Sequence, residues 1–200
     1  MEANAVRSAT AYLEDLGRLL GRVEATGPDG RALAVDEAVS AVVDLVVGLG
    51  QAGGKAMLVG NGGSAAIVSH MQNDLFKMVG LRALVFTEQP LLTALANDDG
   101  YETAFRQCVE RWGAPGDLLF AVSSSGQSAN ITSAVAAAEA RGCRAVTFSG
   151  FRPDNRLRQM GDVRFYVPSD TYGGVELTHA ILGHCISDFA AARVGWSAAR

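Results

Sequence analysis

The sequence predicts an α/β protein in which helices cover both faces of a five-stranded parallel sheet, a three-layer αβα sandwich. From Lys55 onward, short runs rich in β-branched and aromatic residues alternate with longer runs of helical periodicity, which is typical of a parallel sheet. With 200 residues and 48% hydrophobic composition, the chain can bury one full core. Two small-residue turns each lie between a strand-like and a helix-like run, where α/β sheets bind ligands.

The first fifty residues predict two helices that form a hairpin ahead of the sheet. Leucine and valine recur at the spacing of one helix face, first over residues 13–23 and then over residues 39–49. The helix-breaking run Gly27-Pro28-Asp29-Gly30 separates the two segments. We therefore divide one domain, residues 1–200, into N-terminal helices over residues 1–52 and an αβα core over residues 53–200.

Five strands and four helices are expected in the core. The strands are predicted at residues 56–59, 83–86, 118–122, 145–148 and 163–167. The helices are predicted at residues 64–79, 101–112, 128–141 and 175–194. Because the carboxyl ends of parallel strands meet at one edge of a sheet, both small-residue turns should lie at that edge.

Charge and composition favour a cytoplasmic protein that binds a small molecule. The formal net charge is −4, and no cluster of lysine and arginine offers a surface for nucleic acid or for an anionic membrane. No apolar stretch reaches the roughly 20 residues that span a bilayer, and the N-terminus lacks the apolar core of a signal peptide. Cys108, Cys143 and Cys185 are widely spaced, so neither a disulfide framework nor a thiolate zinc site is indicated.

Two turns indicate a phosphate ligand: Gly60-Asn61-Gly62-Gly63-Ser64 and Ser123-Ser124-Ser125-Gly126-Gln127-Ser128. Glycine lets the backbone approach a ligand closely, and the N–H groups in the first turn of a helix point outward unpaired. Serine hydroxyls add further neutral donors to an anion. We therefore expect one phosphate between two helix N-termini, and hence a phosphorylated small molecule.

The turns also admit other interpretations. Residues 60–65 match the dinucleotide fingerprint G-x-G-x-x-A, and Glu88 follows the next strand at a tolerable distance for a ribose contact. A dinucleotide site does not require a serine-rich second turn, whereas a phosphate between two helices does, so a sugar phosphate is favoured over NAD. Simple helix capping explains Ser128 but assigns no role to residues 123–125.

Titratable side chains gather on two of the predicted helices. His70 and Asp74 are one turn apart on one face, where they can bind a metal or move a proton, although an ion pair without chemistry is an equal alternative. The last helix carries Glu176, His179 and His184 among apolar residues, where polar groups need partners. At 100° per residue the two histidines lie about 140° apart, so one faces the site more directly than the other.

In this order and spacing the motifs resemble those of the phosphoheptose isomerases, which belong to the sugar-isomerase (SIS) domain superfamily. The resemblance covers nearly the whole chain and rests on residues 58–66, 96–98, 116–117 and 123–130, on His70 and Asp74, and on the two histidines five residues apart. It implies a flavodoxin-like SIS fold and a homotetramer with active sites near the subunit interfaces. In this tetramer the N-terminal oligomerisation helices, residues 1–52, would pack between subunits. It also implies conversion of sedoheptulose 7-phosphate into D-glycero-D-manno-heptose 7-phosphate.

The resemblance assigns roles to individual residues. Phosphate is held by residues that match Ser64, Ser123, Ser124, Ser125 and Ser128, and the substrate-binding set also includes Gly62, Gly63, Asn97, Asp98 and Glu176. Zinc, one ion per subunit, would be bound by His70, Asp74, Glu176 and His184. We assign Asp74 as the base and His184 as the acid of an aldose–ketose shift through a cis-enediol.

Four positions depart from the family pattern. Asp74 stands in place of glutamate, Glu176 of glutamine, Met78 of arginine and Gly173 of aspartate. The shorter side chain of Asp74 can displace a base by about 1 Å, and the added charge of Glu176 should favour a divalent metal. These departures leave the fold prediction intact. They keep open an isomerase for another long-chain ketose phosphate, such as an octulose 8-phosphate in antibiotic sugar biosynthesis.

A non-catalytic relative is the alternative of a different class. Some SIS tetramers that resemble this protein bind a replication-initiator protein, and such proteins tend to lose the histidine of the last helix, whereas His184 is present here. A sugar-phosphate sensor would keep the serine turns and tolerate loss of the acid–base cluster, which is also retained. The sequence therefore favours an enzyme.

Overall fold

Five parallel strands form the centre of one sheet in the computed structural model, which describes residues 8–197. They are β3 (Lys55–Gly60), β4 (Arg82–Val85), β5 (Leu118–Ser123), β6 (Arg144–Ser149) and β7 (Val163–Tyr166). Each strand lies within one residue of its predicted bounds. The ends of the predicted domain, residues 1–7 and 198–200, lie outside the described residues.

A short antiparallel hairpin extends the sheet to seven strands and corrects the prediction for the N-terminal region. β1 (Glu24–Thr26) and β2 (Ala32–Leu33) pair with each other, and β1 pairs antiparallel with β7. The sheet order is therefore β2-β1-β7-β6-β5-β3-β4. The predictions of only five strands and of a helical hairpin were wrong, because β1 is too short to show a local pattern and gains its partner from the edge of β7.

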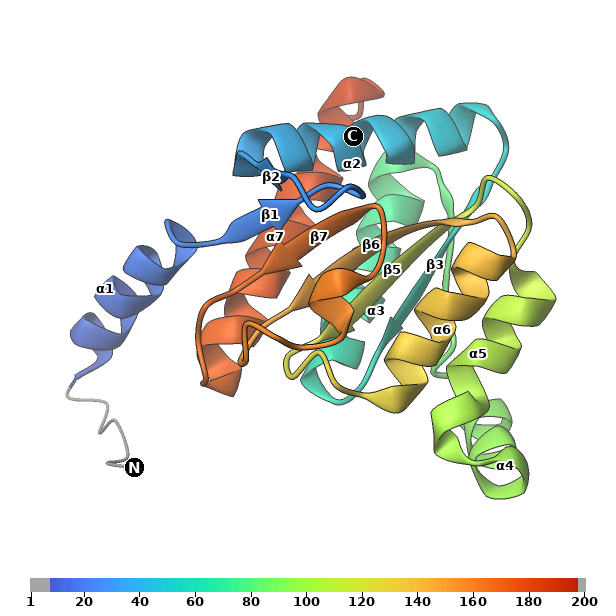
Figure 1. Cartoon of the computed structure of the whole chain (residues 1–200). Helices are drawn as coiled ribbons and strands as arrows, with labels where there is room; N and C mark the ends of the chain where they lie inside the picture. The colour runs from blue at the N-terminus through green and yellow to red at the C-terminus, as the bar shows by residue number, and fades with distance from the viewer. Residues whose placement is uncertain (1–7, 198–200) are drawn as a thin grey trace.

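The two predicted N-terminal helices exist but do not form a hairpin with each other. α1 (Ala9–Leu20) projects from the body of the molecule, and α2 (Val35–Gln51) lies across one face of the sheet (Figure 1). α1 contacts the first turns of α7 (Tyr172–Arg193), where Leu19 packs with Val175. A side-chain carbon at Gly173 would lie 2.7 Å from the hydroxyl oxygen of Tyr12, so α1 covers this position of α7 closely.

Helices cover both faces of the sheet, so the predicted three layers are present. One hydrophobic cluster unites α2, α3 (Gly63–Asp74) and α7 with one face, and a second unites α5 (Tyr101–Trp112) and α6 (Ala129–Ala140) with the other (Figure 1). β3 serves both clusters in alternation, with Ala56 and Leu58 in the first and Met57 and Val59 in the second. None of the helices within residues 8–197 has the length and hydropathy that crossing a membrane requires.

Two local features differ from the predicted helices. α3 ends at Asp74 and continues as a π-helical turn, η1 (Leu75–Val79), within the single helix predicted at residues 64–79. α4 (Gln89–Asp99) was not predicted, because it has no buried residue and so no continuous apolar face. A 3₁₀ turn, η2 (Leu157–Gln159), completes the described elements.

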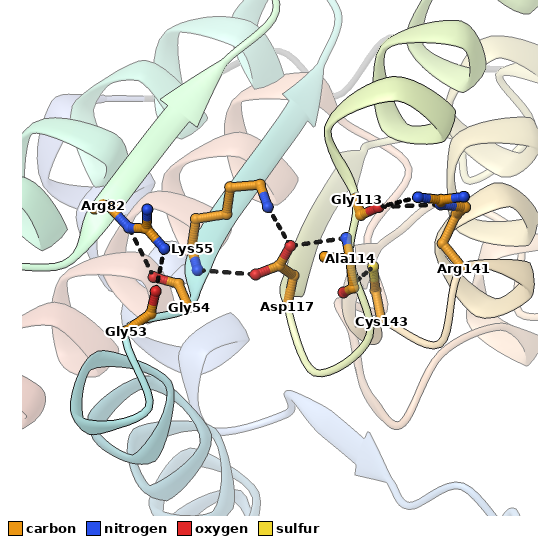
Figure 2. Close-up of polar contacts among 9 residues, drawn as sticks. All are labelled: Gly53, Gly54, Lys55, Arg82, Gly113, Ala114, Asp117, Arg141 and Cys143. Atoms are coloured by element: carbon orange, nitrogen blue, oxygen red, sulfur yellow. Dashed lines mark hydrogen bonds and ion pairs between the residues drawn. The ribbon is translucent and has the colours of Figure 1, made fainter.

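Hydrogen bonds and ion pairs close the amino edge of the sheet (Figure 2). Asp117 accepts the backbone N–H groups of Lys55 (3.0 Å) and Ala114 (2.9 Å) and pairs with the ammonium of Lys55. Burial alone would raise the pKa of Asp117, but Lys55 and the backbone donors hold it below its usual value. Arg141 donates two hydrogen bonds to the carbonyl of Gly113 (2.8 and 3.0 Å). The Asp117 motif therefore has a structural role, since it ties the start of β5 to the start of β3.

The chain changes direction at the carboxyl edge between β3 and β5. From β3 it runs through α3 to β4 on one side, and from β5 through α6 to β6 on the other, with α3 and α6 on opposite faces. The two strands end together, because Gly60 is opposite Val122. Ligands bind at such a switch point in α/β sheets. Both small-residue turns lie there, which confirms their predicted placement.

Candidate active site

Two helices begin at the carboxyl edge without a side-chain cap. Gly62, the N-cap of α3, has a φ of 54°, and Ser128, the N-cap of α6, makes no side-chain bond to the backbone of its helix. Neither first turn carries an acidic residue. A methyl group at Gly60 would lie 2.6 Å from the carbonyl oxygen of Ser64, so glycine is what lets β3 end this close to α3. Uncapped N–H groups and the positive ends of two helix dipoles suit an anion.

The serine hydroxyls of the second turn differ in what they contact. Ser123 Oγ accepts the N–H three residues on (3.2 Å) and lies 3.3 Å from Ser128 Oγ, and Ser125 Oγ accepts the N–H two residues on (3.2 Å). Ser124 is 5% exposed, and its hydroxyl has no hydrogen-bond partner among the described residues. A buried hydroxyl without a partner costs free energy, so it favours a ligand that accepts its hydrogen bond.

Glu176 lies at the first of the two turns. A side-chain carbon at Gly63 would overlap both carboxylate oxygens of Glu176, so the carboxylate contacts the first residue of α3. Ser64 follows in the same helical turn and is buried. The structure thus brings Glu176 together with the predicted phosphate-binding residues Gly62, Gly63 and Ser64. A carboxylate at this helix end is favoured by the helix dipole.

Asn97 and Asp98 lie at the end of α4, and both are exposed. Asn97 donates a hydrogen bond to Asp98 (2.7 Å), and no side-chain hydrogen bond within residues 8–197 joins either residue to the two turns. Their predicted contact with substrate stays a prediction.

A histidine, an aspartate and a second histidine meet where α3 packs against α7. Asp74 Oδ2 is 3.4 Å from His70 Nε2 and 3.5 Å from His184 Nδ1, and the two imidazole centroids are 4.9 Å apart. Asp74 is 7% exposed, whereas more than half of each histidine side chain is exposed. The predicted acid, the predicted base and three of the four predicted metal ligands are therefore in one place, as the helical spacing of His70 and Asp74 indicated.

Neighbouring groups orient the carboxylate of Asp74. Asn73 donates a hydrogen bond to Oδ1 (3.2 Å), and Ser187 Oγ lies 3.5 Å from Oδ2 while it donates to the Gly183 carbonyl (3.0 Å). The cluster lines a pocket of about 260 Å³ together with Ala66, Ile67, Met71, Ala180 and Gly183. The π-helical turn begins directly after Asp74, and such turns are frequent at functional sites.

The donor atoms of His70, Asp74 and His184 all lie within 4.8 Å of one another. Two imidazole nitrogens and one carboxylate oxygen suit Zn²⁺, which keeps a fourth position for water or substrate in catalytic sites. Glu176 contributes no atom to this group. The structure therefore brings together three of the four predicted metal ligands and places the fourth at the phosphate end.

The two histidines of α7 have opposite surroundings, which explains the expected difference between them. His179 is 1% exposed, and its Nε2 donates to the carbonyl of Ser149 (3.1 Å). Burial lowers the pKa of His179 to about 4, and the Ser149 hydrogen bond opposes this shift only in part. His179 is therefore a neutral, buried imidazole at the end of β6, and its Nδ1 has no partner among the described residues.

The phosphate end and the acid–base cluster are separate within one chain. Ser64 and Asp74 are ten residues apart on α3, which corresponds to about 15 Å along the helix axis. On α7, Glu176 likewise lies at the phosphate end and His184 lies at the acid–base cluster. The structure thus has two half-sites, one for an anion and one for acid–base or metal chemistry.

Comparison with known proteins shows the family of this chain. The SIS domain family matches residues 11–150. The phosphoheptose isomerase of Thiobacillus denitrificans is 38% identical over 144 residues, which cover 68% of this chain and 73% of that protein. The phosphoheptose isomerase of Burkholderia pseudomallei is 37% identical over 164 residues, which cover 79% and 81%.

Solved structures show the same fold. The phosphoheptose isomerase of Neisseria gonorrhoeae superposes with a TM-score of 0.80 at 28% identity and covers 92% of this chain and 96% of its own. A phosphoheptose isomerase from Francisella tularensis gives a TM-score of 0.81 at 24% identity, with coverage of 95% and 100%. The second of these comparisons is evidence for the fold alone.

Proposed function

The chain belongs to the SIS-domain family and, within it, to the phosphoheptose isomerases, and from this premise we propose that it converts sedoheptulose 7-phosphate into D-glycero-D-manno-heptose 7-phosphate. The observation that carries the proposal is that the chain holds an uncapped, serine-rich anion site and a separate His–Asp–His cluster. Phosphate binding and aldose–ketose isomerisation need one of each.

The phosphate of the substrate binds between the first turns of α3 and α6. The first-turn N–H groups of both helices and the hydroxyls of residues 123–125 and 128 supply the donors. Ser124 gains the partner that it lacks among the described residues, so its bond forms without the loss of an existing one. These neutral donors hold the anion locally in a chain of net charge −4.

Asp74 and His184 perform the proton transfers. Asp74 removes the proton from C1 of the open-chain ketose while His184 protonates the oxygen on C2, which produces a cis-enediol. Asp74 then delivers the proton to C2, and His184, which gave up its proton in the first step, takes the proton of the C1 hydroxyl as the aldehyde forms. The 3.5 Å separation of Asp74 Oδ2 and His184 Nδ1 lets both groups reach neighbouring atoms of one substrate.

The donor set of His70, Asp74 and His184 fits Zn²⁺, and we assign one ion per subunit to it. A bound zinc ion polarises a carbonyl and stabilises negative charge on the substrate oxygens. A carboxylate that binds a metal tightly is a poor free base, so metal content and activity have to be measured on the same sample.

We place the complete active sites near the interfaces of a homotetramer. The half-sites are about 15 Å apart along α3, which supports a site that a second subunit completes. Exposed apolar residues flank the cluster, among them Phe76 (62% exposed), Leu177 (41%) and Ile181 (37%). Light scattering tests the tetramer. Mixing Ser124→Ala subunits with His184→Ala subunits tests sharing, because the kcat/KM of the mixture rises above that of both variants only if one site draws on two subunits.

The metabolic setting is part of the same proposal. An isomerase of this specificity supplies heptose for biosynthesis and acts on a small phosphorylated metabolite in the cytoplasm. The expected partner is therefore a sugar phosphate, not a nucleic acid or a membrane.

Phosphorus and proton NMR with sedoheptulose 7-phosphate in deuterium oxide is the decisive experiment, run with added zinc and with a chelator. We expect an aldose phosphate with deuterium at C2, and a slower reaction with the chelator. Turnover of an octulose 8-phosphate with by far the higher kcat/KM would assign the chain to that substrate. No turnover of any ketose phosphate would contradict the enzyme proposal in favour of a non-catalytic tetramer.

A further inference from the structure

A pair of asparagines joins the two turns of the phosphate end. Asn61 follows β3 in the first turn, and Asn130 lies in the first turn of α6. Asn61 Nδ2 donates to Asn130 Oδ1 (2.9 Å), and Asn130 Nδ2 donates back to Asn61 Oδ1 (2.9 Å). Tyr101, at the start of α5, donates its hydroxyl to Asn61 Oδ1 (2.7 Å). Three separate segments of the chain therefore meet at these two amides, which we call the asparagine pair.

The hydrogen bonds determine how the asparagine pair is oriented. An amide oxygen has two lone pairs, and those of Asn61 accept Tyr101 and Asn130. Asn130 is 3% exposed, so it is shielded from water and its bonds are not readily exchanged for bonds to solvent. Both lone pairs of the Asn61 oxygen are thus committed to protein partners, and the Asn130 oxygen accepts one bond from Asn61. This commitment suits a role in holding the turns rather than in contacting substrate.

Neither the sheet nor the packing of α3 and α6 fixes the distance between the two turns. The β3–β5 ladder aligns the strands as far as Gly60 and Val122 and ends there. Beyond this point α3 packs into the cluster on one face and α6 into the cluster on the other. A phosphate that takes donors from both turns needs them at a set separation, because a hydrogen bond to an anion weakens steeply when its length or angle departs from the ideal.

We propose that the asparagine pair, oriented by Tyr101, is a positioning element that sets the separation of the two turns and thereby the affinity for the substrate phosphate. The ligand in this inference rests on the proposed function, whereas the link between the turns rests on the hydrogen bonds alone. The hydrogen bonds of the pair are to each other and to Tyr101 and to no group of the His–Asp–His cluster, so the pair should control KM far more than kcat.

Asn130→Ala and Asn61→Ala test the proposal through KM, kcat and the inhibition constant of inorganic phosphate. We expect KM and the phosphate constant to rise together by about 10- to 100-fold, with kcat within about threefold of wild type. The double variant should be no worse than the worse single variant, because both remove the same bonds. Tyr101→Phe leaves the reciprocal bonds in place and should raise KM by only about two- to fivefold.

Ser133→Ala is the matched control. Ser133 donates to the carbonyl of Glu102 (2.7 Å) and to the backbone carbonyl of Asn130 (3.1 Å) but to neither side-chain amide of the pair, so its loss tests the helix contacts without the amide link, and KM should stay within about twofold of wild type. Thermal unfolding shows which variants fold. Asn61 is less buried than Asn130, and its alanine variant carries the test if Asn130→Ala does not fold.

Three results would each overturn the proposal. They are a fall in kcat as large as the rise in KM, additive effects in the double variant, and an unchanged inhibition constant of inorganic phosphate. Calorimetric titration of inorganic phosphate separates this failure from failure of the proposed function. If the wild type binds phosphate but isomerises no ketose phosphate, the proposed function fails while the asparagine pair is still tested by phosphate affinity.

Discussion

At the amino edge of the sheet, Asp117 accepts hydrogen bonds from Lys55 and Ala114, whereas at the carboxyl edge the hydroxyl of Ser124 is buried with no partner in the described part of the chain. The same contrast holds for larger groups. Arg141 donates to a backbone carbonyl at the amino edge. By contrast, His70 on α3 and His184 on α7 expose more than half of their side chains.

The contrast separates polar groups that hold the fold from polar groups that remain available for a ligand. A buried charge is tolerated when protein donors satisfy it, as Asp117 shows (Figure 2). A buried hydroxyl without a partner is a local cost that binding of an anion can relieve. Substitutions of the groups that hold the fold should therefore lower stability more than activity. Substitutions of the groups that remain available should lower activity more than stability.

The largest effect is expected at the acid–base cluster. Asp74→Asn and His184→Ala should each lower kcat/KM about a thousandfold, because general acid–base groups contribute about 10²- to 10⁴-fold. The measurement is isomerase kinetics alongside thermal unfolding, which should change little. Asp44→Asn, in the exposed ion pair with Arg193 (3.0 Å), is the matched control and should leave kcat/KM unchanged. Full turnover by a folded Asp74→Asn protein would show that another group is the base.

The next effect is on stability, at the amino edge. Asp117→Ala leaves Lys55 without its carboxylate and should lower the free energy of unfolding by about 3 kcal/mol, while kcat of the folded protein stays within about twofold. Denaturant titration measures the first quantity and steady-state kinetics the second. Asp154→Ala, in an exposed pair with Arg152, should leave the free energy of unfolding almost unchanged. A large fall in kcat without a loss of stability would place Asp117 in the active site.

His179 should make stability depend on pH. Its pKa is about 4 in the folded protein and about 6.5 in the unfolded chain, so below pH 6.5 the unfolded chain binds a proton that the folded protein does not. The free energy of unfolding should therefore fall by about 2 kcal/mol between pH 7 and pH 5. His179→Gln keeps a donor for Ser149 but does not titrate, and it should remove this part of the slope. An unchanged slope in urea titrations of the variant would contradict a neutral His179.

The smallest effect separates two buried hydroxyls. Ser124→Ala removes an unpartnered group, so it should cost no stability and raise KM about tenfold. Thr147→Val removes a hydroxyl that donates to the Met160 carbonyl (2.9 Å), so it should cost about 1 kcal/mol and leave KM unchanged. Chemical denaturation and kinetics of both variants decide the matter. Loss of stability in Ser124→Ala would mean that its hydroxyl already has a partner.

Sequence patterns located the two turns and most of the residues around them. The turns are recognisable because glycine and serine follow strand-like runs directly, and His70 and Asp74 are recognisable because they are one helical turn apart. Sequence patterns did not assign a role to Asn61, Asn130 or Tyr101. Their only signal is that the two asparagines lie inside the motifs, and their hydrogen bonds join segments far apart in the chain.

The sequence by itself determined the five parallel strands, the helices between them except α4, and the position of both turns, because each depends on periodicity and turn chemistry within a few residues. Only the tertiary structure decided that β1 pairs with β7 and that Glu176 lies against Gly63 instead of joining His70. It also decided which histidine of α7 is buried and neutral. These outcomes depend on which faces of distant elements pack together, and a local pattern carries no information about its partner.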